Sequence, residues 1–148
     1  MERFTDSLGT QINITARSLR VALERELAAT GITPSQWMIL MALGEKNHQV
    51  QTELGKMVNL DSATITRVLD KLQEMSIIVR NQDKVDRRAQ IVSLTPRGDE
   101  AYRAWNAIGR KVNERAAKNL TGKDRKKLLE WLALIEANLN NTNAGKPT

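Results

Sequence analysis

The sequence predicts a mainly α-helical protein in which one β-hairpin interrupts a series of amphipathic helices. Three observations indicate this fold class. Apolar residues recur every three or four positions over most of the 148 residues, two β-prone runs flank one short polar segment, and two of the three prolines stand where a helix would begin. The expected order is four helices, a hairpin and two further helices.

The first four helices precede the hairpin. Apolar residues spaced by multiples of three or four predict the first helix over residues 8–27. The second helix begins at residues 33–36, Thr-Pro-Ser-Gln, where Thr33 and Gln36 form a capping box with proline at the first helical position. Shorter amphipathic patterns predict the third and fourth helices over residues 51–58 and 62–75.

The hairpin and the last two helices follow. The β-prone runs are residues 77–80 and 90–94, and they flank the polar residues 81–88. Thr95 and Pro96 open a helix expected over residues 96–119, and a weaker cap at Thr121 opens the last helix, over residues 122–140.

Composition excludes several classes of function. The chain is 41% hydrophobic and 27% charged, as in a soluble globular protein, and it has no cysteine and one histidine, His48. Disulfides, thiol chemistry, metal sites and a histidine-based catalytic centre are therefore not expected. The chain has no apolar run long enough to cross a bilayer, and its N-terminus does not resemble a secretory signal. We expect a cytoplasmic protein that is not an enzyme, binds no metal or cofactor and does not associate with membranes.

The net charge of +6 is weak evidence for an anionic partner. Residues 104–148 hold nine basic and four acidic side chains, so nearly all the excess lies at the C-terminal end. The simplest interpretation of that stretch is a solvated helix surface. The central part of the chain is more informative.

Residues 51–69 have the pattern of two short helices joined by a tight turn. Gly55 permits their close approach, and Asn59 stands where a left-handed turn residue is expected. The shared core is expected to comprise Leu54, Val58, Leu60, Ile65 and Val68. Any helical hairpin could match part of this pattern, but the polar β-hairpin that follows favours a winged helix-turn-helix, which reads DNA.

The second helix of this pair is the expected reading helix. Its first turn carries the short residues Ser62, Ala63 and Thr64, which would permit close approach to base edges in the major groove. Arg67 can form a bidentate contact with guanine; alternatively, it pairs with Asp61 or Asp70 on a solvated surface. The expected DNA-facing residues of this helix are Ser62, Ala63, Thr64, Thr66, Arg67 and Lys71.

The hairpin tip supplies the other expected DNA contact. Arg87 and Arg88 are suited to a narrow minor groove, where the negative potential is deepest. Asp86 is expected to brace one of the two guanidinium groups by a fork-shaped pair and to leave the other for the groove. We favour Arg88 over Arg87 as the residue that enters the groove.

The sequence resembles the MarR family of transcription regulators over residues 8–140. The resemblance is carried by Thr33-Pro34-Ser35-Gln36-Trp37, Thr52-Glu53-Leu54-Gly55, Thr64 to Leu72, Asp86-Arg87-Arg88 and Val92 to Gly98. It implies an obligate homodimer on a near-palindromic operator, often released by a small phenolic or aromatic-carboxylate effector. Val50 departs from the family, which usually has a serine or threonine cap there. The missing cysteines exclude the thiol-sensing branch.

The last helix supports a dimer independently of the resemblance. Residues 128–135 are apolar on more than one side of a helix, which calls for burial by a partner subunit or in the centre of the chain's own core. We therefore expect an N-terminal dimerisation helix (1–32), a winged helix-turn-helix (33–95), C-terminal dimerisation helices (96–140) and a disordered tail (141–148).

An effector site is expected where the family has its usual pocket, lined by the start of the second helix. Trp37 and Met41 would form an apolar slot, and Arg17 and Arg20 on the first helix would supply cations for an aromatic carboxylate. The alternative is that Trp37 belongs to the core and the arginines are solvated.

The resulting prediction is a homodimeric regulator, expected to be a repressor, that binds specific double-stranded DNA. The alternative is a winged-helix module that docks on another protein and does not bind DNA. The two differ in the salt dependence of duplex binding, which is steep only for a DNA-binding protein.

Overall fold

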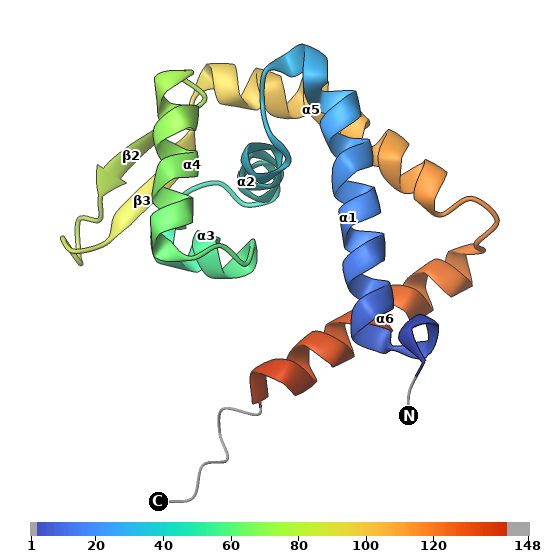
Figure 1. Cartoon of the computed structure of the whole chain (residues 1–148). Coiled ribbons are helices and arrows are strands. Elements are labelled where there is room, and N and C mark those ends of the chain that lie inside the picture. The colour runs from blue at the N-terminus through green and yellow to red at the C-terminus, as the bar shows by residue number, and fades with distance from the viewer. Residues whose placement is uncertain (1–2, 142–148) are drawn as a thin grey trace, which may run out of the picture. The chain divides into compact units, whose positions relative to one another are not determined.

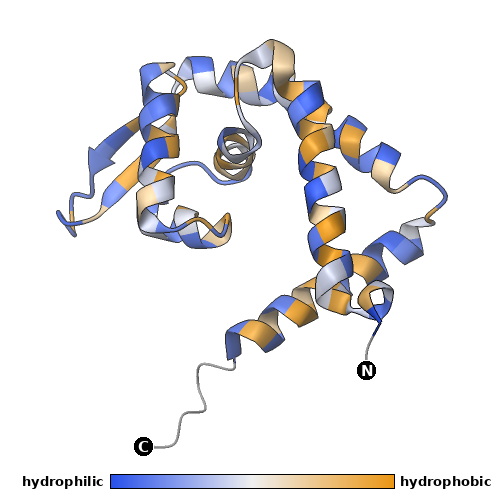
Figure 2. Cartoon of the chain, in the orientation of Figure 1, coloured by the Kyte–Doolittle hydropathy of each residue, from blue (hydrophilic) through white to orange (hydrophobic). Residues whose placement is uncertain are grey.

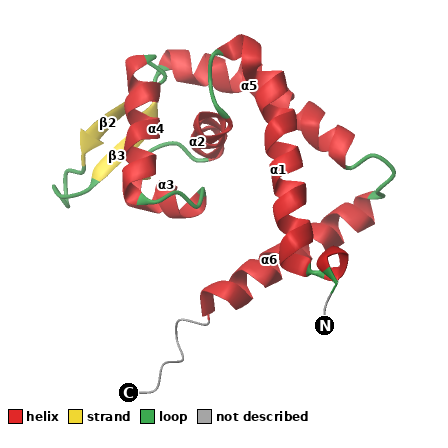
Figure 3. Ribbon diagram, in the orientation of Figure 1, coloured by secondary structure: helices red, strands yellow, loops and turns green. Residues whose placement is uncertain are grey.

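The computed structural model describes residues 3–141 and contains, within that range, six α-helices, two 3₁₀ helices and three β-strands (Figures 1 and 3). The predicted order of four helices, a hairpin and two helices is confirmed. The structure adds two 3₁₀ helices and one short strand that the sequence did not predict. The elements are η1 (Phe4–Asp6), α1 (Leu8–Leu27), η2 (Ala28–Thr30), α2 (Pro34–Glu45), β1 (Gln49–Val50), α3 (Gln51–Met57), α4 (Ser62–Glu74), β2 (Ile78–Gln82), β3 (Gln90–Leu94), α5 (Pro96–Ala116) and α6 (Gly122–Asn141).

Local capping signals fix where the helices begin. The Thr33 hydroxyl accepts from the Gln36 N–H at 3.3 Å, while the Gln36 amide oxygen accepts from the Thr33 N–H at 2.9 Å. Thr121 and Asp124 form a reciprocal pair of the same kind before α6. Helix α5 ends three residues earlier than predicted, and α6 extends to Asn141, so the rest of the expected disordered tail lies outside the described residues.

The sheet has the strand order β1-β3-β2 and is antiparallel throughout. Strand β1 was not predicted: Gln49 pairs with Val92 and Val50 with Ile91. This pairing gives a role to Val50, which stands where the family usually has a capping serine or threonine. Its extended backbone pairs with β3, while its side chain cannot cap α3. Helix α3 accordingly begins without a side-chain cap.

The chain divides into two compact units, Met1–Val112 and Asn113–Thr148. The core of the first unit lies among α2, α3, α4 and the sheet. Helix α2 is strongly apolar in Figure 2, and three of its side chains, Ile39, Leu40 and Leu43, are fully buried. Gly98 at the start of α5 lies against the backbone carbonyl of Ile77, where a Cβ would collide. The core thus joins the helix pair, the hairpin and α5.

Helix α6, in the second unit, buries none of its residues in the described structure. Leu129, Trp131 and Leu134 are all more than half exposed. The choice between burial by a partner subunit and burial in the chain's own core stays a prediction for this segment. Figure 2 shows hydrophobic and hydrophilic residues mixed along α6.

Candidate nucleic-acid interface

Helices α3 and α4 form the predicted helical pair. Gly55 is buried, and a Cβ placed on it would lie 3.3 Å from the Leu60 carbonyl oxygen and 3.5 Å from Ile65 Cγ2. Asn59 has φ 54°, and the Leu60 N–H donates to the Gly55 carbonyl at 2.9 Å. The close approach and the left-handed turn are both confirmed, and together they set the angle at which α4 leaves α3.

Asp61 caps the start of α4. Its carboxylate accepts from the Thr64 backbone N–H at 2.8 Å and from the Thr64 hydroxyl at 2.9 Å. These hydrogen bonds, the backbone one foremost, hold the pKa of Asp61 below its ordinary value. Asp61 is therefore committed to the helix terminus, and the nearby charge of Arg67 makes a smaller contribution to the lowered pKa.

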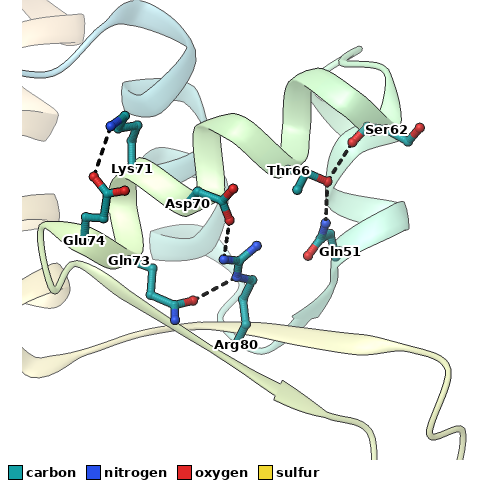
Figure 4. Close-up of polar contacts among 8 residues, drawn as sticks. All are labelled: Gln51, Ser62, Thr66, Asp70, Lys71, Gln73, Glu74 and Arg80. Carbon is teal, nitrogen blue, oxygen red and sulfur yellow. Dashed lines mark hydrogen bonds and ion pairs between the residues drawn. The ribbon is translucent and has the colours of Figure 1, made fainter.

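The remaining predicted residues of α4 lie on its outer surface. Ser62, Ala63, Thr66, Arg67 and Lys71 are exposed, and Thr64 is half-buried. The hydroxyl of Thr66 donates to the Ser62 carbonyl at 2.8 Å and accepts from the side-chain amide of Gln51 at 3.3 Å (Figure 4). Gln51, which the sequence analysis missed, thereby places an amide from α3 beside the same face.

One alternative from the sequence was an ion pair between Arg67 and Asp70. The described structure does not contain this pair, because Asp70 binds another arginine. The Arg67 guanidinium donates to Thr64 Oγ1 at the long distance of 3.4 Å. Asp70 instead binds Arg80 on β2, at 2.5 Å from Nη2 (Figure 4). Arg67 is consequently held only weakly, and its guanidinium remains on the exposed face of the helix.

The wing tip, residues 83–89, closes with hydrogen-bonded turns. Asp83 Oδ1 accepts from the N–H groups of Val85 and Asp86, and the Asp83 N–H donates to the Ala89 carbonyl at 2.9 Å. Sequence reasoning did not assign a role to Asp83, although aspartate two residues before a turn centre is a known turn signal. Val85 at the tip is 95% exposed.

Asp86 braces Arg88, the arginine that the sequence favoured for the groove, and which of the two arginines enters the groove stays a prediction. Asp86 Oδ1 accepts from the backbone N–H of Arg88 at 3.1 Å and from its Nε at 3.2 Å. The aspartate turn brings Arg88 back to the Asp86 carboxylate. The expected bracing exists, but through one oxygen and not as a fork, and the arginine without this brace is Arg87. Arg88 nevertheless remains 92% exposed.

The residues expected to bind an effector are partly engaged within the chain. Trp37 Nε1 donates to the Trp105 carbonyl at 3.2 Å, and its ring lies against Gly109 of α5. Met41 packs on the core, and Arg20 pairs with Glu24 at 3.3 Å on the surface, while Arg17 is exposed. These contacts match the alternative of core packing and solvated arginines, and the effector site stays a prediction.

Comparison with known proteins agrees with this geometry. The model of the MarR family matches residues 32–89, from the loop before α2 to the wing. The HTH-type transcriptional regulator YdgJ of Bacillus subtilis is 31% identical over 117 residues, which span 79% of this chain and 71% of YdgJ. The chain belongs to the MarR family. The predicted family and the winged helix-turn-helix fold are thus confirmed.

Two solved structures of transcription regulators extend the agreement. A probable transcriptional regulator from Pseudomonas aeruginosa is 30% identical, with a TM-score of 0.81 over 90% of this chain and 99% of that one. The transcriptional repressor CouR, solved bound to a 23-mer DNA duplex, is 25% identical, with a TM-score of 0.79 over 90% of this chain and 94% of CouR.

MarR-family membership makes this protein a transcription regulator and confirms that it is not an enzyme. Within residues 3–141, no helix has the length and apolar character that a membrane span requires, and no cluster of three potential metal ligands occurs.

Proposed function

We propose that this MarR-family protein binds a near-palindromic DNA operator as a homodimer and represses transcription there. The observation that carries the proposal is the shared exposure of two elements: the first turns of α4, with short side chains and Arg67, and the wing tip with Arg87 and Arg88. Short residues admit the helix end to the major groove, and the wing arginines suit the minor groove beside it.

The homodimer is supported by the exposed apolar side chains of α6. A two-fold dimer presents two reading helices to two half-sites, which accounts for a near-palindromic operator. Repression is supported by the relative CouR, whose structure was solved on duplex DNA. The proposal includes release of the operator by an aromatic carboxylate bound near Trp37.

The test is duplex binding as a function of salt, first with random-sequence duplex and then with a palindrome selected from a random library. A DNA-binding protein loses affinity linearly on a log–log plot, because phosphate contacts release counterions. The expected selectivity for the selected site over random duplex is on the order of 10³-fold or more. A protein-docking module would bind neither duplex, and that result would overturn the proposal.

The wing is tested with three single variants. Arg88→Ala and Arg87→Ala should each lower operator affinity, by about 10-fold for the arginine that enters the groove. The loss should be greatest on A·T-rich flanks, where the minor groove is narrow. Asp86→Ala should also weaken binding, although it removes a negative charge, because it releases the Arg88 side chain and the turn that carries it.

Lys84→Ala is the matched control, since Lys84 is an exposed cation of the same turn. Its effect should be small and independent of the flanking sequence. A gain of affinity for Asp86→Ala would show that Asp86 acts through its charge alone and would overturn the bracing role.

A further inference from the structure

Arg80 links the wing to the reading helix. It lies on β2, and its side chain is only 19% exposed, against 92% for Arg88 at the wing tip. Nε donates to Gln73 Oε1 at 2.8 Å and Nη2 to Asp70 Oδ1 at 2.5 Å (Figure 4). One guanidinium thus binds two side chains of α4, and this polar contact adds to the hydrophobic core that α4 and the hairpin share.

The geometry of this link fixes how β2 is oriented relative to α4. Asp70 and Gln73 are three residues apart, so their side chains lie on the same face of α4. The backbone of Arg80 is held by the sheet, because Arg80 pairs with Val92 in the middle of the β2–β3 ladder. Two hydrogen bonds from different nitrogens of a planar group restrict both the position and the rotation of one element relative to the other.

We infer that Arg80 is a positioning residue, which holds the wing at a fixed orientation to α4 through Asp70 and Gln73 and so sets DNA affinity without contacting DNA. The inference rests on the proposed function, in which α4 and the wing enter different grooves of one duplex. A wing already oriented before binding loses less conformational freedom when the complex forms.

The competing role is a direct phosphate contact by Arg80, and the two roles predict opposite signs. If Arg80 bound phosphate, removing Asp70 would free a cation and remove a repulsive anion, and affinity would rise. If Arg80 positions the wing, removing Asp70 abolishes one of its two anchors, and affinity falls although the protein becomes more positive.

The experiment compares Asp70→Ala with the matched control Glu74→Ala. Both variants remove one exposed carboxylate from the same helix, but Glu74 pairs with Lys71 of α4 at 3.1 Å and not with the wing (Figure 4). We expect Asp70→Ala to lower operator affinity on the order of 10-fold, and Glu74→Ala to leave it unchanged or raise it. Arg80→Lys, which keeps the charge but loses the two-atom fork, should behave like Asp70→Ala.

A second measurement needs no DNA. Because the chain has no cysteine, spin labels can be placed specifically at Met57→Cys on α3 and Val85→Cys on the wing, both exposed positions. Labelled protein diluted into unlabelled protein should give a narrow distance distribution in the parent and in Glu74→Ala. The distribution should broaden in Asp70→Ala and Arg80→Lys.

The two measurements separate the inference from the function on which it rests. An unchanged distance distribution in Asp70→Ala, or tighter operator binding by that variant, overturns the positioning role. Failure of the parent protein to bind any duplex overturns the proposed function, while the distance measurement still decides whether Arg80 holds the wing. Melting curves of each variant confirm that the differences arise in folded protein.

Discussion

At the scale of single residues, Arg67 is the side chain of α4 that we propose reads a base. It is exposed, its hydrogen bond to Thr64 is long at 3.4 Å, and Asp70 is engaged by Arg80. Arg67→Ala should lower affinity for the selected operator by about 10-fold and relax the preference at one base pair, because a bidentate guanine contact contributes roughly 1–3 kcal/mol. Binding to operators with single base-pair substitutions measures both effects.

Lys71→Ala is the control for that measurement. Lys71 is an exposed cation one turn further along α4, where we expect contact with the phosphate backbone. Its loss should weaken binding to operator and random duplex equally and reduce the salt slope by about 1. If Arg67→Ala showed this same uniform loss, Arg67 would be a phosphate contact and not a base reader.

At the scale of elements, a residue just after α4 has a strained backbone conformation, and a glycine substitution should relieve that strain. Ser76 has φ 60°, and the following Ile77 N–H donates back to the Leu72 carbonyl at 2.9 Å, the arrangement in which helices usually place glycine. A left-handed conformation costs an L-residue roughly 1–2 kcal/mol, while added freedom of glycine in the unfolded chain offsets about 0.4–1 kcal/mol. Ser76→Gly should therefore raise the free energy of unfolding by about 0.5–1 kcal/mol, measured by urea denaturation.

Ser76→Ala separates the backbone effect from the loss of the hydroxyl, since alanine keeps the Cβ that makes a left-handed conformation costly. Its stability should stay close to that of the parent. A gain for Ser76→Ala as large as that for Ser76→Gly would place the cost in the serine side chain and contradict the backbone explanation.

At the scale of the whole molecule, the exposed apolar residues of α6 predict an obligate dimer. Leu132→Glu places a charge on the apolar side of this helix, and a charge buried without a partner is strongly unfavourable. Sedimentation should give a mass near twice 16.6 kDa for the parent and near 16.6 kDa for Leu132→Glu. Operator binding should fall with the dimer, because one subunit engages only one half-site.

Ala137→Glu adds the same charge to an exposed position elsewhere on α6, and we expect it to leave the dimer intact. The dimer prediction would fail if the parent protein sedimented as a monomer at the concentrations where it binds operator. It would fail equally if both variants dissociated to the same extent.

The sequence by itself determined the features that depend on neighbouring residues. The capping box of Thr33, the left-handed turn at Asn59 and the close approach at Gly55 each follow from the conformational preferences of a few consecutive positions. The order of elements, the fold class and the family followed from such signals in combination. The exposed face of α4 followed as well, since helical periodicity fixes which side of the helix faces the core.

Tertiary structure decided which distant groups meet. Strand β1 is two residues long and exists only because Gln49 and Val50 lie beside β3, so no local pattern could predict it. Asp70 has acceptable partners in Arg67 on its own helix and Arg80 on β2, and periodicity cannot choose between them. The folded hairpin decides between the two partners, because it places the Arg80 guanidinium within hydrogen-bond distance of both Asp70 and Gln73. Pairings of this kind depend on the path of the backbone between the partners, which only the assembled fold determines.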